Sequence, residues 1–280
     1  MGAFADEAAR RLKSNPAAVA ALSVTCAIIV LTLIGPWISP NDVQTLDWLH
    51  IAAPPGRSAH WFGTDRLGRD LFVRTLAGTR VSLAIGLAAS VVSLLVGVTY
   101  GAIAGYIGGR TDHLMMRLIE ILSGLPLIFF VIFLTVIFGR SEYLLFFAIG
   151  AVGWLTMARI VRGQTLSIRQ KEFIEAAIAS GASTGRIILR HVVPNVIGPV
   201  IVYATLTVPQ IILLESFLSF LGLGIQEPGA SLGTLIAEGA AEMEAAPWIL
   251  LVPGSFLALL LLCLNIFGDG LRDALDVKDG

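Results

Sequence analysis

Long apolar stretches, separated by shorter polar segments, dominate the chain. Six of them are long enough to cross a hydrocarbon core about 30 Å thick, at about residues 17–38, 81–105, 118–138, 143–161, 196–222 and 248–267. Few charged residues interrupt these stretches, which is the pattern of membrane-spanning helices. We therefore predict an all-α polytopic membrane protein with six transmembrane helices.

Two features inside the spans predict local geometry. Gly97, Gly101 and Gly105 recur every four residues and form a stripe of small residues, which favours close approach of a neighbouring helix. Pro126 is expected to kink the third span. A short loop over residues 106–117 is expected to join the second and third spans.

A single carboxylate, Glu215, lies deep in the fifth span. A carboxylate at that depth is costly and should face the bundle interior or a watery cavity. Two interpretations stay open: a residue of the substrate pathway, together with Phe217 and Phe220, or a structural glutamate hydrogen-bonded between helices.

The polar segments divide the chain into regions. We predict an N-terminal segment (1–16), a first span (17–38), an outer connector (39–79), a five-span domain (80–270) and a tail (271–280). Residues 3–14 form either a short amphipathic helix in the headgroup region or a frayed polar terminus. Residues 228–247 have a helical apolar face and are expected to lie flat at the outer interface.

The outer connector contains the run from His60 to Asp70. If this run is helical, Asp65 pairs with Arg69 and Asp70 with Arg74 at four-residue spacing. We interpret it as a salt-bridged cap on the outer face of the bundle.

Residues 171–194 form an unusually long polar segment between two spans. Residues 172–180 are mostly strong helix formers, with an apolar face of Phe173, Ala176 and Ala177. Gly181 is suited to ending this helix, and Ser183 to capping a second one over residues 184–191. Pro194 is expected to stop the second helix. Such a helix pair either docks into another protein or is a structured interfacial loop.

Charge placement predicts the orientation. Of the 19 lysines and arginines, most lie on the side of the N-terminus, as do all the lysines. The positive-inside rule then places both termini and the 171–194 segment in the cytoplasm.

Composition restricts the chemistry. The chain of 280 residues is 56% hydrophobic and 14% charged. Its net charge is −1, so it has no overall basic surface that would bind nucleic acid. No phosphate-binding GxxxxGK[ST], HExxH or GxSxG motif is present, and we expect no enzyme activity in this chain.

Cys26 and Cys263 lie in apolar runs and are interpreted as packing residues. The four histidines are scattered, so no metal site is expected.

The polar segment also resembles a known motif. Glu175-Ala176-Ala177, Gly181 four positions later and Pro194 thirteen positions after that resemble the EAA loop of ABC importer permeases. His191 and Val193 depart from the isoleucine and leucine frequent in that family. Further runs resemble the dipeptide/oligopeptide branch: FGTDRLGRD (62–70), ESFLSFLGLGIQEP (215–228) and FGDGLRDALD (267–276). Within the branch, the match over residues 215–220 and the run over residues 226–228 favour the oligopeptide members.

The resemblance implies a type I importer permease of the bacterial cytoplasmic (inner) membrane. It implies that a coupling helix docks on an ATPase subunit, through Glu175, Ala176, Ala177, Gly181, Arg186 and Pro194. The implied partners are a second homologous permease, two ATP-binding subunits, an extracytoplasmic peptide-binding protein, the peptide and membrane lipid. ATP and Mg would bind to the ATPase subunits, with no cofactor in this chain.

Alternatives remain within and outside the family. Permeases for dipeptides, glutathione or nickel share parts of these runs. A stand-alone secondary transporter is the rival class; it would usually need internal repeats and buried ion-binding charges, and a single deep carboxylate argues against it.

Overall fold

A computed structural model describes residues 2–57, 60–139 and 142–275. These residues contain helices and no strands, which confirms the all-α prediction. The helices are α1 (Gly2–Ser14), α2 (Pro16–Ile38), α3 (Leu71–Ile107), α4 (Gly109–Ser123), α5 (Leu127–Phe138), α6 (Glu142–Arg169), α7 (Glu172–Ala179), α8 (Thr184–Ile187), the π-helical turn η1 (Ile188–Val192), α9 (Val193–Phe220), α10 (Leu232–Ala241) and α11 (Trp248–Leu275).

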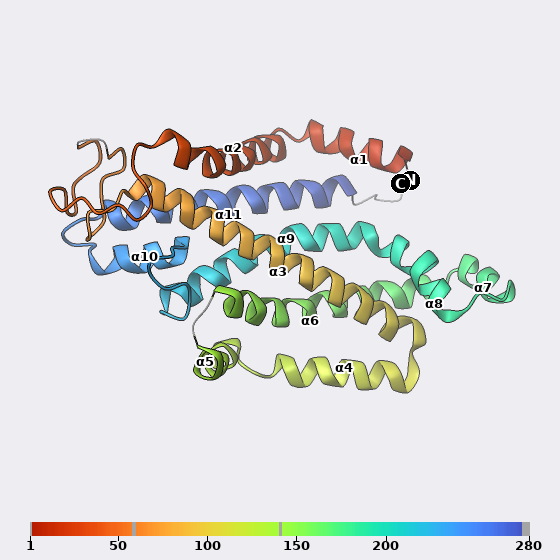
Figure 1. The fold of residues 1–280 in the computed structure, drawn as a ribbon. Helices are drawn as coiled ribbons and strands as arrows, with labels where there is room; N and C mark the ends of the chain where they lie inside the picture. The colour runs from red at the N-terminus through yellow and green to blue at the C-terminus, as the bar shows by residue number, and fades with distance from the viewer. Residues whose placement is uncertain (1, 58–59, 140–141, 276–280) are drawn as a thin grey trace.

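The long helices form an elongated bundle with two distinct ends (Figure 1). The loop between α2 and α3 and helix α10 lie at one end, which we call the loop end. Helices α1, α7 and α8 and the end of α11 lie at the other, which we call the coupling end. Helix α3 runs through the middle and packs against α6, α9 and α2.

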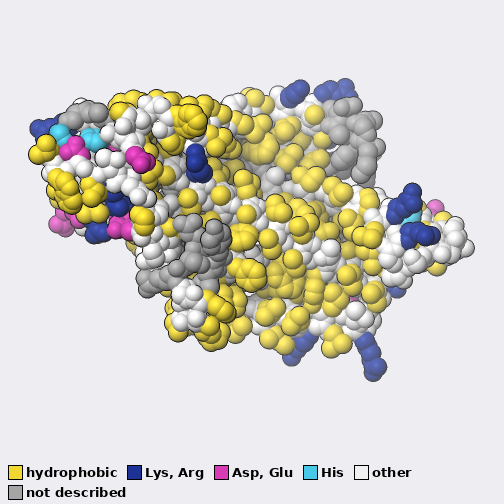
Figure 2. Space-filling model, in the orientation of Figure 1, with side chains coloured by type: hydrophobic (Ala, Val, Ile, Leu, Met, Phe, Trp, Pro, Cys, Tyr) yellow, Lys and Arg dark blue, Asp and Glu magenta, His cyan; other side chains and the backbone are white. Residues whose placement is uncertain are grey.

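Among the described residues, five helices are long and apolar enough to cross a membrane, and the bent pair α4–α5 makes six if it is counted as one span. Apolar side chains cover the broad flank of the bundle (Figure 2). The helices therefore satisfy their backbone hydrogen bonds internally while presenting apolar surface to lipid.

The glycine stripe brings α3 and α6 into close contact, as predicted. A Cβ atom added at Gly101 would lie 2.8 Å from Cβ of Val161 and still closer to the carbonyl oxygen of Ala158. Added Cβ atoms at Gly97 and Gly105 would likewise meet atoms of α6 at 2.6–2.8 Å. The two backbones can approach this closely because the stripe has no side chains.

This packing predicts that Gly101→Ala destabilises the protein by about 1–3 kcal/mol, since the blocking atoms include backbone that cannot move aside. Gly163→Ala is the matched control, because nothing lies within 4 Å of that position. Thermal unfolding of both variants in detergent checks the difference. Equal stability of the two variants would contradict the packing assignment.

The third predicted span differs from the structure. Helix α4 begins at Gly109, directly after α3, so the loop predicted over residues 106–117 is wrong. The kink expected at Pro126 is a break: α4 and α5 meet at 79°. Proline lacks a backbone N–H and disfavours helical geometry at the preceding Leu125, so the chain leaves the helix and restarts at Leu127.

Two segments at the loop end are also more ordered than predicted. Helix α3 starts at Leu71, before the predicted span, because the Asp70 carboxylate accepts a hydrogen bond from the Val73 amide at 3.0 Å and caps the helix. Helix α10 does not lie flat at an interface. Leu232 and Leu235 are buried, and the helix packs against α9 and α11.

Candidate functional site

Helices α7 and α8 project from the coupling end of the bundle (Figure 1). Gly181 makes the turn between them with φ of +78°, a conformation that only glycine adopts without strain. The Gly181 amide donates to the Ile178 carbonyl at 2.9 Å, and the Ala182 amide donates to the Ala177 carbonyl at 3.1 Å. These two bonds are the Schellman motif, so α7 ends as predicted. Ser183 holds the N-cap position of α8, but its side chain makes no capping bond.

Two buried isoleucines fix the projecting pair to the bundle. Ile174 of α7 is 0% exposed and Ile187 of α8 is 1% exposed. Both belong to one apolar cluster with side chains of α3, α6 and α9, including Val98, Val161 and Val196. Close packing in this cluster attaches α7 and α8 to the long helices of the bundle.

The apolar residues predicted for α7 lie in two environments. Ala177 is half-buried and packs against this cluster, whereas Phe173 is 43% exposed and Ala176 is exposed. Ile178 of the same helix is 56% exposed. The helix thus packs one face on the bundle, and the described residues leave a second, partly apolar face exposed.

The charged residues of the predicted coupling element lie on the uncovered surface. Glu175 and Arg186 are exposed, as is Gly181. Basic side chains are visible on this projecting end in Figure 2. Glu175 also borders a hollow of about 400 Å³ that is lined by Arg169, Ile178 and Thr184. Exposed charges beside exposed apolar groups are the composition of a surface that binds another protein.

Pro194 does not stop the second helix, contrary to the prediction. Helix α8 continues through η1 into α9, and residues from Thr184 to Phe220 form one continuous helical span. Pro194 is the second residue of α9, which directly follows the π-helical turn, and such local π adjustments in membrane helices satisfy the backbone groups that a proline frees. Helix α8 is thus the end of a helix that runs through the bundle.

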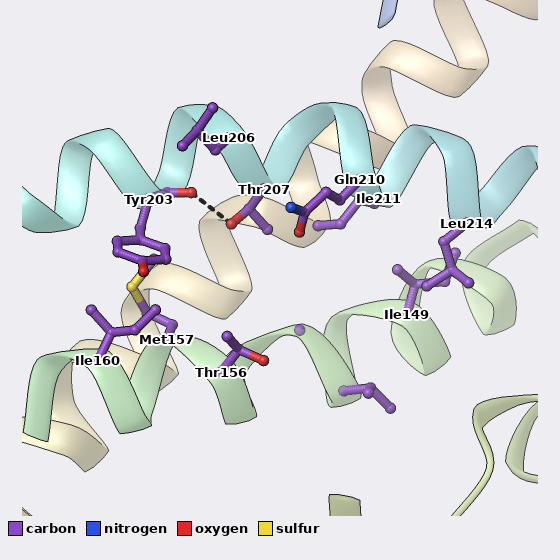
Figure 3. Close-up of a pocket in the computed structure, with 12 residues that line it drawn as sticks. Ile149, Thr156, Met157, Ile160, Tyr203, Leu206, Thr207, Gln210, Ile211 and Leu214 are labelled. Carbon is purple, nitrogen blue, oxygen red and sulfur yellow. Dashed lines mark hydrogen bonds between the residues drawn. The ribbon is translucent and has the colours of Figure 1, made fainter. Parts of the chain in front are cut away.

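A cavity of about 290 Å³ lies between α6 and α9. Tyr203 extends from α9 toward Met157 and Ile160 of α6 (Figure 3). Thr156, Thr207 and Gln210 add polar groups to an otherwise apolar lining. This wall could not be predicted from the sequence, because none of its polar residues is charged and all of them fit an ordinary membrane span.

The three predicted pathway residues do not lie together on this wall. Glu215 is 0% exposed and accepts hydrogen bonds from Ser82 of α3 at 2.9 Å and Ser219 of α9 at 2.7 Å. The Ser82 hydroxyl in turn accepts the Leu232 amide of α10. Phe217 and Phe220 are exposed, and neither lines this cavity. The geometry therefore favours the structural interpretation of Glu215, and a pathway role for the three residues stays a prediction.

An ion-pair network joins the elements of the loop end. Asp65 accepts hydrogen bonds from Arg69 and Arg74, and Arg74 also donates to Glu238 of α10 at 3.1 Å. Asp65 and Arg74 are each 1% exposed. Burial raises the pKa of Glu238 to about 7, while the nearby Arg69 opposes this shift. The predicted Asp65–Arg69 pair and the salt-bridged cap are confirmed.

The predicted Asp70–Arg74 pair is wrong. The Asp70 carboxylate instead caps α3 and contacts Nδ1 of His60 at 2.7 Å. The assumption of helix across residues 65–74 caused the error, because α3 begins only at Leu71.

The expectation of scattered histidines also needs correction. His50 and His60 lie together at the loop end with Asp47, and one ligand atom from each lies within 4.8 Å of the others. The loop between α2 and α3 folds back on itself, which residue spacing alone did not reveal.

Comparison with known proteins identifies the family. Residues 97–278 match the family described as "Binding-protein-dependent transport system inner membrane component". Residues 4–55 match the family described as "N-terminal TM domain of oligopeptide transport permease C". The chain belongs to the binding-protein-dependent ABC importer permeases, as the EAA-like run predicted.

Several relatives are similar over nearly the whole chain. The oligopeptide transport system permease protein OppC of Haemophilus influenzae is 55% identical, covering 98% of this chain and 88% of that protein. The protein of the same name from Escherichia coli strain K12 is 54% identical, covering 98% and 91%. The dipeptide transport system permease protein DppC of Bacillus subtilis is 46% identical, covering 98% and 86%.

A solved structure supports the fold. An inward-facing form of the MetNI methionine ABC transporter contains a chain that matches with a TM-score of 0.58 and 18% identity. The match covers 72% of this chain and 96% of that one. At this identity the likeness shows the fold, which is that of an ABC importer permease.

Proposed function

We propose that this chain is a transmembrane subunit of an ATP-driven importer of oligopeptides, with α7 and α8 as its contact to an ATPase subunit. The observation that carries the proposal is the double attachment of the projecting pair. Ile174 and Ile187 are buried in the bundle core, and α8 is continuous with α9. A partner that moves α7 would therefore move the wall of the cavity between α6 and α9.

The complete importer needs other chains. In this proposal a second, homologous permease lies beside this one in the inner membrane, and two ATPase subunits bind ATP and Mg at the coupling end. A binding protein delivers the peptide at the loop end. Both termini and the α7–α8 pair are then cytoplasmic, and this chain catalyses no reaction by itself.

In this proposal, peptide specificity is shared between the binding protein and the transmembrane passage that the cavity between α6 and α9 lines. The wall formed by Tyr203, Thr207 and Gln210 suits a peptide backbone, because it offers hydrogen-bonding groups without a fixed charge. The 54–55% identity to two OppC proteins favours oligopeptides over the dipeptide, glutathione or nickel alternatives.

Cross-linking tests the contact with the ATPase. The starting chain carries Cys26→Ala and Cys263→Ala, since these are its cysteines. We expect Ala176→Cys, on the exposed face of α7, to cross-link to the ATPase subunit with a short thiol reagent. The reacted pair is detected as a band that contains both chains.

Leu49→Cys is the matched control, because Leu49 is 90% exposed at the loop end. It should give no ATPase cross-link. A cross-link from Leu49→Cys, with none from Ala176→Cys, would reverse the orientation and remove α7 as the docking element. No ATPase cross-link from either position would favour the stand-alone secondary transporter.

A further inference from the structure

Three potential metal ligands converge in the loop between α2 and α3. Oδ2 of Asp47 lies 2.8 Å from Nδ1 of His50 and 3.4 Å from Nε2 of His60. In a tetrahedral zinc site, metal–ligand bonds of about 2.0–2.1 Å place neighbouring ligand atoms about 3.3 Å apart. The Asp47–His60 separation is close to this value, the Asp47–His50 separation is about half an ångström shorter, and all three ligand atoms lie within 4.8 Å of one another.

The surroundings of His60 determine which of its nitrogens is available. Nδ1 lies 2.7 Å from Oδ2 of Asp70, a buried carboxylate held by the Val73 amide and by the side-chain amide of Asn41 at 3.0 Å. The Asp70 carboxylate accepts, so Nδ1 is the donor to it, and Nε2 is the nitrogen that faces Asp47. A carboxylate behind a ligating histidine is the usual outer shell of a metal site.

One carboxylate oxygen of Asp47 is positioned to serve as a metal ligand. Its Oδ1 accepts the Leu49 amide at 3.0 Å, which leaves Oδ2 for the site. His60 is 6% exposed, whereas the side chains of Asp47 and His50 are 33% and 32% exposed, so solvent ions reach the site from one side.

We propose that Asp47, His50 and His60 bind a divalent transition-metal ion of the zinc class, with water completing the coordination. Two imidazoles and one carboxylate suit zinc and its neighbours rather than Mg²⁺ or Ca²⁺, which prefer oxygen ligands. The ion would tie the loop to the start of α3, because Asp70 caps that helix and also holds His60. The proposal concerns this chain alone and does not rest on the transport function.

Zinc titration of the purified full chain in detergent, without a histidine tag, tests the site. We expect one zinc ion per chain, measured by competition with a chromophoric chelator. Asp47→Asn and His50→Ala should each weaken binding by at least about tenfold, since each removes one of three ligands. Both positions lie near the surface, so these variants are expected to fold.

His113→Ala is the matched control, because His113 lies on α4 and contacts the Gly109 carbonyl away from the site. It should bind zinc as tightly as the unchanged chain. Cobalt(II) provides a second readout, with the strong visible absorption of tetrahedral coordination in the unchanged chain and its loss in Asp47→Asn. Absence of zinc binding, or binding equally tight in Asp47→Asn and His50→Ala, would overturn the proposal.

Discussion

Replacing Arg74 with alanine is expected to destabilise the protein by about 3–5 kcal/mol, because it leaves buried carboxylates without their main partner. Arg74 is 1% exposed and bridges Asp65 in the α2–α3 loop to Glu238 of α10. Asp65 is equally buried and, among the described residues, would retain only Arg69 as a cationic partner. Thermal unfolding in detergent, followed by intrinsic fluorescence, measures the change.

Arg66→Ala is the control for this prediction. Arg66 carries the same charge in the same loop, but its side chain is 50% exposed and lies 3.5 Å from Glu227. Exposed pairs contribute about 0–1 kcal/mol, so Arg66→Ala should unfold close to the unchanged protein. Similar losses in the two variants would show that the buried network does not hold the loop end together.

Glu175→Lys is expected to reduce ATP-driven peptide uptake by at least about tenfold, since losing a charge contact at a docked interface costs about 2–5 kcal/mol. Glu175 is exposed on α7, so the substitution removes no core packing. Insertion into the membrane and thermal unfolding of the chain should remain unchanged. Uptake of a labelled peptide and ATPase activity are measured in the same vesicles.

Glu120→Lys is the matched control for the coupling surface. Glu120 is also an exposed carboxylate, with a single ion pair to Arg117 on its own helix α4. It should leave uptake within about twofold, because an exposed pair contributes little. Normal uptake with Glu175→Lys, or an equal loss with Glu120→Lys, would remove Glu175 from the coupling element.

The all-helical class and the number of membrane spans could be predicted from the sequence, because bilayer thickness sets the length of each apolar stretch. The glycine stripe also predicted close packing, since Gly97, Gly101 and Gly105 recur on one helical face. The partner helix α6 could not be predicted, because a small-residue stripe carries no information about which helix approaches it.

Breaks and continuations of helices were less predictable. Pro126 and Pro194 are the same residue type, yet the chain breaks at the first and continues through the second. The difference comes from context, since a π-helical turn precedes Pro194 and packs Ile188 and Val192 into the core. Helix propensity depends on the local sequence, so it cannot predict this effect of packing against other helices.

The motif drew attention to residues 171–194, but the face of α7 that packs on the bundle could not be predicted. Ile174, rather than Phe173, enters the core, because the direction of approach of α7 to the bundle decides which side is buried. The partners of Arg74 and the meeting of His50 with His60 depend on loop folding over long sequence separations. Local spacing rules such as i,i+4 pairing do not reach that far.

The most direct test of the account is peptide uptake into proteoliposomes that contain this chain, its partner permease, the ATPase subunits and the binding protein. We predict uptake that requires ATP and is lost when any one subunit is omitted. Uptake driven by an ion gradient with this chain alone would contradict the account, and would make the chain a secondary transporter instead.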